Sequence, residues 1–347
     1  MPFTVTLSQS QRRFPVNANE SVLDGAQRAD LSMPWRCRRG DCGSCRARVL
    51  DGHTAPIWGD ETGEEVDPRE VRLCSVRATT DLVIAAREVL AVEDVPCRRV
   101  ALEVVELTQL APQVMDVALA ADPSAALRWL PGQYLELILD DGSRRAFSIA
   151  NAQVADPHLH LHVRHVAGGS FTRAVFEELK VGDRFAAEAP IGTFVPREGS
   201  DRPMIFVAGG TGFAPIRAIV QHFLALGSTR PMHLYWGARR AEDLYLRHEA
   251  EDWMRQAPWL HFHGVLSEAD GGGDLRRGLV HEAVVADHPR LAGYEVYLCG
   301  PPAMIDAGRH AFFDAGLPES RLYFDTYEYA PDVLADILGE RAGIAGR

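Results

Sequence analysis

The sequence lacks several features that would assign it to a broad class. No uninterrupted apolar run reaches 18 residues, so we expect no transmembrane helix. The first residues contain no apolar stretch of the kind that a secretory signal needs, so we expect a cytoplasmic protein. Positive charge is scarce, since 36 lysines and arginines stand against 48 acidic residues, and the net charge of −12 argues against binding to nucleic acid. Six cysteines among 347 residues are too few for a disulfide scaffold.

The cysteines that are present are unevenly spread. Four of the six fall within one short stretch: Cys37, Cys42, Cys45 and Cys74. This C-x4-C-x2-C spacing with a distant fourth cysteine is typical of a plant-type [2Fe–2S] site, and Gly40 and Gly43 permit the tight loop it needs. A structural zinc site is the main alternative, although it usually has two close cysteine pairs, and unrelated buried thiols are the other.

The residues around these cysteines predict a small β-rich domain over 1–90. Residues 3–7 and 46–50 alternate in the manner of strands, and Ser21 is a candidate N-cap for a helix. A charged, irregular stretch over 87–97 is interpreted as a linker. Cys97, outside the pattern, is expected to be a small buried side chain.

The sequence pattern of the rest of the chain changes near residue 200. Over 98–200, short alternating segments with turn signals, such as 140–143, predict an antiparallel β-barrel. Over 201–328, strands alternate with helical runs, which predicts a parallel-sheet α/β domain. The expected fold is therefore a multidomain α+β and α/β chain, followed by an extension over 329–347.

Two constellations have chemistry that suits a nucleotide. Between a predicted strand and a helix stand Gly209, Gly210, Thr211 and Gly212. Backbone N–H groups at such a helix start favour a diphosphate, while a plain tight turn is the alternative because G-x-G-x-x-G is absent. Arg145, Phe147 and Ser148 combine a cation, an aromatic ring and a hydroxyl, although an exposed arginine beside a core phenylalanine is the simpler interpretation.

Two further turns follow the same logic. Gly169, Ser170 and Thr172 resemble another glycine-rich helix start with a hydroxyl cap. Cys299, Gly300 and Pro301 stand at the end of a predicted parallel strand, where α/β sheets bind ligands, but for Cys299 alone a buried thiol is the simpler interpretation.

Histidines and arginines provide two less specific patterns. His158, His160 and His162 alternate on one face of a predicted strand, for which we favour a solvated face over a zinc site, and Arg164 follows within reach of a phosphate. Around the cysteine loop lie Arg36, Arg38, Arg39 and Arg46. They indicate either a solvated face or a basic patch that steers an acidic partner.

The order of these motifs resembles the ferredoxin–NAD(P)H reductase superfamily. The subgroup it resembles has a plant-type [2Fe–2S] ferredoxin domain (β-grasp) fused to the N-terminus, and it includes reductase components of bacterial oxygenases and a CDP-6-deoxy-glucoseen reductase. The resemblance covers residues 1 to about 328. It departs from the usual pattern at Phe147, where tyrosine is commoner, and at Thr172, where serine is frequent.

The resemblance implies roles for the residues. Cys37, Cys42, Cys45 and Cys74 would bind the cluster. Arg145 and the Gly169–Thr172 turn would hold the FAD diphosphate, Phe147 would lie against the flavin, and Ser148 would bond its N5. Gly209 to Gly212 would hold the pyridine-nucleotide diphosphate, with Gly300 and Pro301 nearby. Cys299 would sit beside the nicotinamide, and Tyr327 would cover the flavin.

The function this implies is electron transfer. We expect NADH to supply electrons through FAD and the [2Fe–2S] cluster to an oxygenase, of Rieske or di-iron type, or to an intermediate ferredoxin. The alternatives are a deoxysugar dehydratase reductase and a ferredoxin-like carrier alone. After the strand near 233–236, Arg239 and Arg240 would suit a 2′-phosphate and Asp243 would oppose it, and we favour NADH.

Overall fold

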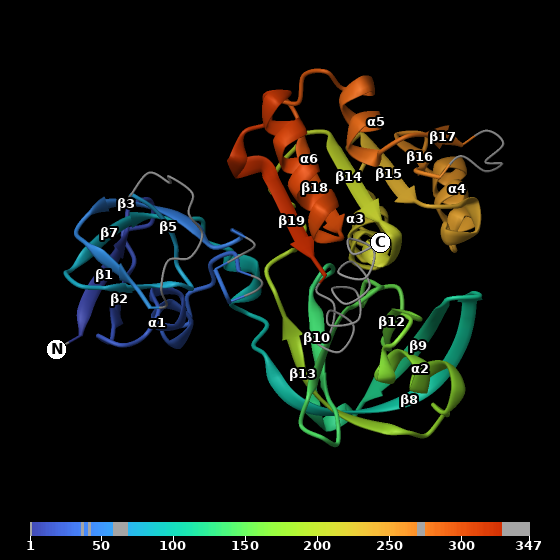
Figure 1. Cartoon of the computed structure of the whole chain (residues 1–347), viewed down its shortest axis with the longest axis horizontal. Helices are drawn as coiled ribbons and strands as arrows, with labels where there is room; N and C mark the ends of the chain where they lie inside the picture. Colours follow the sequence, from blue (N-terminus) through green and yellow to red (C-terminus); the bar gives the residue numbers. More distant parts are fainter. Residues whose placement is uncertain (1, 36–37, 41–42, 58–68, 269–274, 328–347) are drawn as a thin grey trace, which may run out of the picture. The chain divides into compact units, whose positions relative to one another are not determined.

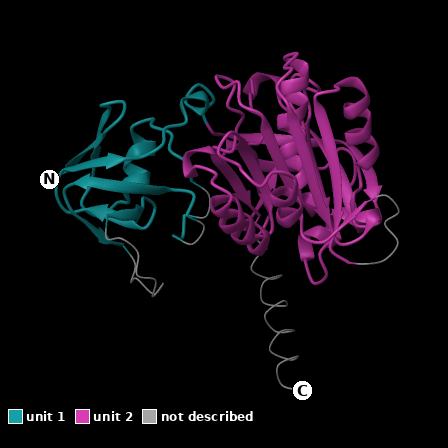
Figure 2. Cartoon of the chain, turned by 90° about the horizontal axis from the view of Figure 1, so that it is seen from above, with its two compact units in different colours: residues 1–96 teal, residues 97–347 magenta. Residues whose placement is uncertain are grey.

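The computed structural model of the chain describes residues 2–35, 38–40, 43–57, 69–268 and 275–327. The chain divides into two compact units, residues 1–96 and residues 97–347 (Figure 2). Within the described ranges no helix is able to cross a bilayer, because the longest, α3 (Phe213–Ala225) and α6 (Pro302–Asp314), have 13 residues where about 20 are needed.

The first unit is a mixed β-sheet with one helix. Its strand order is β2-β1-β7-β3-β5, in which β1 and β7 run parallel and the other neighbours antiparallel. The bounds are β1 Phe3–Leu7, β2 Arg13–Val16, β3 Arg46–Asp51, β5 Glu70–Arg72 and β7 Leu82–Ala85, with β4 Thr54–Pro56 and β6 Val76–Ala78 as a separate pair. Helix α1 (Val22–Arg28) begins after Ser21, whose hydroxyl accepts the Asp24 N–H at 3.0 Å. The expected β-grasp fold and N-cap are confirmed.

The segment that we expected to be a linker packs on this unit. It forms a 3-10 turn, Leu90–Val92, in a stretch where Val89, Val92 and Val95 are buried. Arg12 Nη1 binds Glu88 Oε1 at 3.0 Å and Glu93 Oε1 at 2.9 Å. The charges that suggested an irregular linker therefore fasten the segment to the first unit.

Antiparallel strands form one six-stranded sheet in the second unit, most of which is labelled in Figure 1. The strand order is β11-β10-β13-β8-β9-β12, and a bridge between Ile149 and Leu161 joins the two edges into a barrel. The bounds are β8 Arg98–Ala111, β9 Val114–Ala121, β10 Tyr134–Ile138, β11 Arg144–Ser148, β12 Leu159–Arg164 and β13 Arg184–Ile191, with helix α2 at Ser170–Glu177. The expected turn at 140–143 joins β10 to β11, and Gly142 takes a φ of +78° there. Cys97, just before this barrel, is exposed and not buried as we expected.

A fully parallel sheet follows the barrel. Its order is β17-β16-β15-β14-β18-β19. The strands are β14 Met204–Gly209, β15 Met232–Ala238, β16 Leu260–Leu266, β17 Arg276–Arg277, β18 Glu295–Gly300 and β19 Leu322–Thr326, and the other helices are α4 Arg247–Gln256 and α5 Val280–Asp287. The chain leaves β14 in one direction and returns as β18 on its other side. Ligands of such sheets bind at this switch point.

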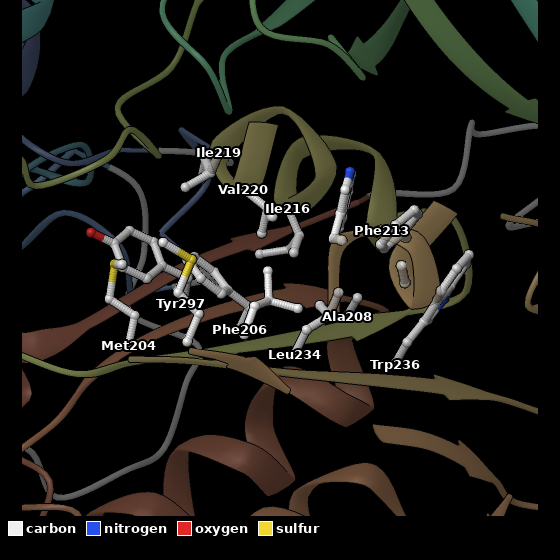
Figure 3. Close-up of a cluster of buried hydrophobic side chains, with 14 of the residues drawn as sticks. Met204, Phe206, Ala208, Phe213, Ile216, Ile219, Val220, Leu234, Trp236 and Tyr297 are labelled. Carbon is white, nitrogen blue, oxygen red and sulfur yellow. The ribbon is translucent and has the colours of Figure 1, made fainter. Parts of the chain in front are cut away.

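Both faces of the parallel sheet are covered. Met204, Phe206 and Ala208 of β14 belong to one buried cluster with residues of α3 and α4, and Figure 3 shows the α3 side of it. Ile205 and Val207, which point the other way, pack against α5 and α6. Burial on two faces explains why β14 is a continuous apolar run in the sequence.

Candidate functional site

Two of the four expected cluster cysteines lie side by side in the first unit. The Sγ atoms of Cys45 and Cys74 are 3.4 Å apart, and both residues are buried. A disulfide needs about 2.05 Å, whereas two thiolates on one tetrahedral metal at about 2.3 Å lie roughly 3.7 Å apart. This pair therefore fits a shared iron. Cys37 and Cys42 lie outside the described residues.

The loop between these cysteines is held to α1. Gly40 and Gly43 have φ of +84° and +71°, as the tight loop requires. The Arg38 guanidinium lies 4.5 Å from the Trp35 ring centre, bonds to Asp24 Oδ1 at 3.1 Å and also bonds to Gln27. Arg38 therefore braces the loop while its side chain stays 47% exposed, and its place in a basic patch stays a prediction. Arg39 and Arg46 are exposed, and Arg36 lies outside the described residues.

The expected flavin residues of the barrel lie on β11, which ends at Ser148. Arg145 and Phe147 are half-buried while their neighbours Arg144 and Ala146 are exposed, which confirms the alternation. The strand ends at Ser148, which is half-buried opposite Tyr134. This short strand therefore carries a ring, a cation and a hydroxyl, none of which is fully buried.

The second expected flavin element adjoins the first. The Phe147 ring centre is 5.6 Å from that of Phe171, which stands between Ser170 and Thr172 at the start of α2. The N-cap is Gly169, which has no side chain, so the hydroxyl cap that we expected is absent. Thr172 Oγ1 instead lies 3.2 Å from the Gly169 carbonyl oxygen and bonds within the turn. An uncapped helix start beside an aromatic ring fits a flavin diphosphate.

The expected nucleotide residues converge at the switch point of the parallel sheet. Gly209 ends β14, the stretch Gly210–Gly212 is a 3-10 turn, and α3 starts at Phe213. Cys299 is buried in β18 and pairs with Ala208 of β14. A Cβ on Gly212 would lie 2.3 Å from the Cys299 carbonyl oxygen, and one on Gly209 would lie 3.0 Å from Pro301. Residues 209–212 and 299–301 thus form one backbone surface.

Three residues that we did not single out build this surface. Trp236 Nε1 donates to the Gly210 carbonyl at 3.0 Å, and the Trp236 ring stacks on Phe213 at 3.7 Å. Met304 Sδ would lie 2.5 Å from a Cβ on Gly209. The buried tryptophan at the end of a predicted strand is a signal that points to such a role, whereas nothing local marks Met304.

Strand β12 brings the barrel to this turn. Arg164 Nη1 would lie 3.4 Å and Tyr327 Oη 3.8 Å from a Cβ on Gly210. Arg164 also pairs with Asp243 at 3.1 Å and, with Arg239 and Arg240, lines a pocket of about 250 Å³. A bare backbone turn beside an arginine fits a pyridine-nucleotide diphosphate.

The histidine face of β12 is not the solvated face that we expected. His162 is buried, its Nδ1 is 3.0 Å from Tyr245 Oη of the parallel-sheet region, and burial lowers its pKa to about 3. His160 binds Asp116 at 2.8 Å, which raises the pKa of the imidazole. Alternation located this face correctly, but packing against Tyr245 buries part of it.

Three models of known protein families match successive parts of the chain. Residues 5–79 match the 2Fe-2S iron-sulfur cluster binding domain, 101–195 the oxidoreductase FAD-binding domain and 206–310 the oxidoreductase NAD-binding domain. The chain is 31% identical over 328 residues to the CDP-6-deoxy-L-threo-D-glycero-4-hexulose-3-dehydrase reductase of Yersinia pestis, covering 94% of this chain and 99% of that one.

Two further relatives extend over the same length. Reductase component 2 of terephthalate 1,2-dioxygenase from Comamonas is 32% identical over 95% of this chain and 99% of its own. The crystal structure of the Amycolatopsis cytochrome P450 reductase GcoB has a TM-score of 0.72 at 32% identity, covering 94% and 99%. The chain therefore belongs to the ferredoxin–NAD(P)H reductase superfamily, as an electron-transfer oxidoreductase that joins a [2Fe–2S] domain to FAD-binding and NAD-binding domains.

Proposed function

We propose that this reductase passes electrons from NADH through FAD and its [2Fe–2S] cluster to a separate oxygenase, of Rieske or di-iron type, in the cytoplasm. An intermediate ferredoxin is an equivalent acceptor. The proposal divides the chain into a ferredoxin domain over 1–90, an FAD domain over 98–200 and an NAD domain over 201–328. The extension over 329–347 lies outside the described residues.

The cluster and FAD are assigned to two sets of residues. The cluster ligands are Cys37, Cys42, Cys45 and Cys74. The FAD set is Arg145, Phe147, Ser148, Gly169, Ser170 and Thr172. Bound FAD supplies the conversion between the two-electron chemistry of NADH and the one-electron chemistry of the cluster. The task of these side chains is to hold and orient it, and none of them has to act as a general base.

The pyridine nucleotide is assigned to the switch point. Gly209, Gly210, Thr211 and Gly212 bind its diphosphate by their N–H groups, and Gly300 and Pro301 shape the adjoining turn. Cys299 lies beside the nicotinamide. Tyr327 is assigned as the side chain that shields the flavin, and its hydroxyl lies near Gly210 of the nucleotide turn.

The single observation that carries the proposal is the buried pair of Cys45 and Cys74 sulfurs at 3.4 Å. A cluster-binding unit in the same chain as the flavin and nucleotide elements provides an exit for single electrons. The dehydrase reductase relative supports a second candidate, in which the acceptor is a deoxysugar dehydratase. A carrier without its own flavin is disfavoured because it leaves residues 98–328 unexplained.

Substitution of Cys74 tests the cluster assignment. Cys74→Ser replaces a soft thiolate with a hard oxygen ligand, which suits iron–sulfur binding poorly. We expect loss of bound iron and of the cluster absorption, with transfer to cytochrome c reduced about tenfold or more, corresponding to at least about 1.4 kcal/mol. Reduction of FAD by NADH should continue in the same sample.

Cys97→Ser is the matched control, because Cys97 is exposed and outside the cysteine pattern. It should keep the iron, the spectrum and the transfer rate. A full cluster spectrum with normal transfer in Cys74→Ser would show that the ligand assignment is wrong. A purified chain without any flavin spectrum would favour the carrier alternative.

The acceptor is identified by anaerobic capture from the native host, followed by reconstitution with the purified partner. An oxygenase that turns over its substrate with NADH only when this reductase is added supports the first candidate. A sugar dehydratase that behaves in this way supports the second, and it would replace the oxygenase proposal.

A further inference from the structure

One helix connects the nucleotide turn to the flavin strand within the second unit. Helix α3 begins at Phe213, directly after Gly212, and carries Arg217 and Gln221 one turn apart. Side chains at positions i and i+4 lie on the same helix face. Both bond to residues 150–152, which begin two positions after Ser148.

The contacts of this segment are backbone contacts. Arg217 Nη1 donates to the Ala150 carbonyl at 2.9 Å, and the Ala152 N–H donates to Gln221 Oε1 at 3.2 Å. Asn151, between them, is buried, and its side-chain amide donates to the carbonyls of Asp156 and His158 at 3.0 and 2.9 Å. The segment 150–152 is therefore held by hydrogen bonds to α3 on one side and to its own barrel on the other.

A carboxylate of α4 orients both side chains of α3. Glu249 Oε2 accepts from Arg217 Nε at 2.7 Å, and Glu249 Oε1 accepts from Gln221 Nε2 at 3.2 Å. The Arg217 and Glu249 side chains are only 19% and 23% exposed, so the ion pair is shielded from solvent. We name Arg217, Gln221 and Glu249, with the backbone of 150–152, the α3 clamp.

We propose that Arg217 is a positioning residue for hydride transfer, which sets the flavin strand end against the nucleotide turn through the α3 clamp. The inference rests on the proposed function, because it takes Ser148 as the flavin contact and Gly209 to Gly212 as the nucleotide contact. Arg217 itself is assigned to neither ligand. Hydride transfer is sensitive to such placement, since an error of about 1 Å costs on the order of 100-fold in rate.

The chemistry of the clamp requires arginine. The planar guanidinium donates in two directions at once, from Nη1 to Ala150 and from Nε to Glu249. Lysine keeps the charge but has one compact ammonium group, so it cannot reproduce both directions. The rate of hydride transfer in Arg217→Lys should therefore lie between the rates of the wild type and Arg217→Met.

The kinetic test uses the intact chain loaded with FAD and cluster, mixed anaerobically with NADH in a stopped-flow instrument. For Arg217→Met we expect the limiting rate of flavin reduction to fall roughly 10- to 100-fold, with Arg217→Lys in between. The dissociation constant of NADH from the same titration should change less than about threefold, because the nucleotide turn itself is intact. A side chain that only stabilises the fold would not lower the limiting rate while leaving the NADH dissociation constant nearly unchanged.

Arg184→Met is the matched control. Arg184 forms an exposed ion pair with Glu103 at 2.7 Å between β13 and β8, away from the clamp. Its loss should leave both the limiting rate and the NADH dissociation constant at the wild-type values. If Arg217→Met fails to retain FAD, Gln221→Ala takes its place, because it removes the bonds to Ala152 and Glu249 and leaves the Arg217 bonds to Ala150 and Glu249 in place.

Hydrogen exchange tests the clamp without any turnover. The peptide spanning 149–153 should exchange faster in Arg217→Met and Gln221→Ala than in the wild type or Arg184→Met. A wild-type limiting rate in the clamp variants, or a raised NADH dissociation constant with an unchanged limiting rate, would overturn the inference. If NADH fails to reduce the FAD of the wild type, the proposed function is wrong. Unchanged hydrogen exchange at 149–153 in the clamp variants separately overturns the role of the α3 clamp.

Discussion

The backbone packed against Gly212 leaves no room for a side chain at this position. Its φ of −60° is accessible to any residue, so the constraint is space and not conformation. A Cβ there would lie 2.3 Å from the Cys299 carbonyl oxygen and 2.7 Å from its carbon. Backbone cannot rotate away as a side chain can, so β14 and β18 would have to separate at the nucleotide turn.

We therefore expect Gly212→Ala to cost about 1–3 kcal/mol of stability, as overpacking usually does. Binding of NAD⁺ should weaken about tenfold, because the turn is displaced. Gly199→Ala is the control, since no atom lies within 4 Å of the added carbon. Urea unfolding and titration with NAD⁺ measure the two effects, and equal values for the two variants would contradict the role of Gly212.

At the scale of the element, strand β12 couples the barrel to the parallel-sheet region. Its alternating residues include His162, which burial keeps neutral, and Arg164, which pairs with Asp243. A second set of histidines lies on β15 and β16, where burial lowers the pKa of His233 to about 4. Both imidazoles have a pKa near 6.5 in an unfolded chain.

These shifts predict a loss of stability on acidification. Between pH 6.5 and about 4 the unfolded chain binds protons that folded His162 and His233 do not, so stability falls as the pH is lowered. The raised pKa of His160 acts in the opposite direction and offsets part of this loss. Each responding histidine contributes up to about 1.4 kcal/mol per pH unit.

His162→Gln isolates the contribution of the buried imidazole, because glutamine does not titrate. Urea unfolding at pH 7.5, 6.5, 5.5 and 4.5 should show a shallower loss of stability than in the wild type. His248→Gln is the control, since that side chain is 97% exposed. A slope in His162→Gln equal to that of the wild type would show that His162 does not carry the effect.

We predict that the turn after β15 governs the choice of nucleotide. Arg239 and Arg240 lie within 3.9 and 3.4 Å of the Glu268 carboxylate, and Asp243 is bound to Arg164. Negative charge at Glu268 and Asp243 opposes a 2′-phosphate. We expect kcat/KM to be higher with NADH than with NADPH.

Glu268→Gln should raise kcat/KM for NADPH by about threefold and leave the NADH value unchanged. The effect is small because exposed ion pairs contribute only about 0.2–1 kcal/mol. Glu103→Gln, in a barrel ion pair, is the control. Steady-state kinetics with both nucleotides provide the measurement, and a wild-type preference for NADPH would refute this assignment.

At the scale of the whole molecule, each unit has its own core. The first unit buries α1 against its mixed sheet, and the second contains separate clusters in the barrel and around the parallel sheet. Compact units with separate cores unfold as separate steps. Metal ligation stabilises only the unit whose fold assembles the cysteines.

Thermal unfolding should therefore show two transitions. Cluster absorbance monitors the first unit, and flavin fluorescence monitors the second. Loss of the cluster in Cys74→Ser should lower the midpoint of the first unit, measured by calorimetry, by about 5 °C or more. Release of FAD should keep its wild-type midpoint. A single transition reported by both probes would contradict independent units.

The sequence by itself determined the features that depend on local spacing. The cysteine pattern, the Ser21 cap, the hairpin at 140–143 and the apolar strand before Gly209 all follow from periodicity and turn chemistry within a few residues. Such signals predicted the three kinds of fold because each element carries its own pattern. The order of the motifs then indicated the superfamily.

Only the tertiary structure decided which faces meet. Alternation identified the His162 face, but Tyr245, 83 residues away, makes it buried. The bond from Arg217 to Ala150 likewise joins residues 67 apart, and neither residue has a local mark. A face is solvated or buried according to what packs on it, and that partner comes from a distant element whose position no local pattern encodes.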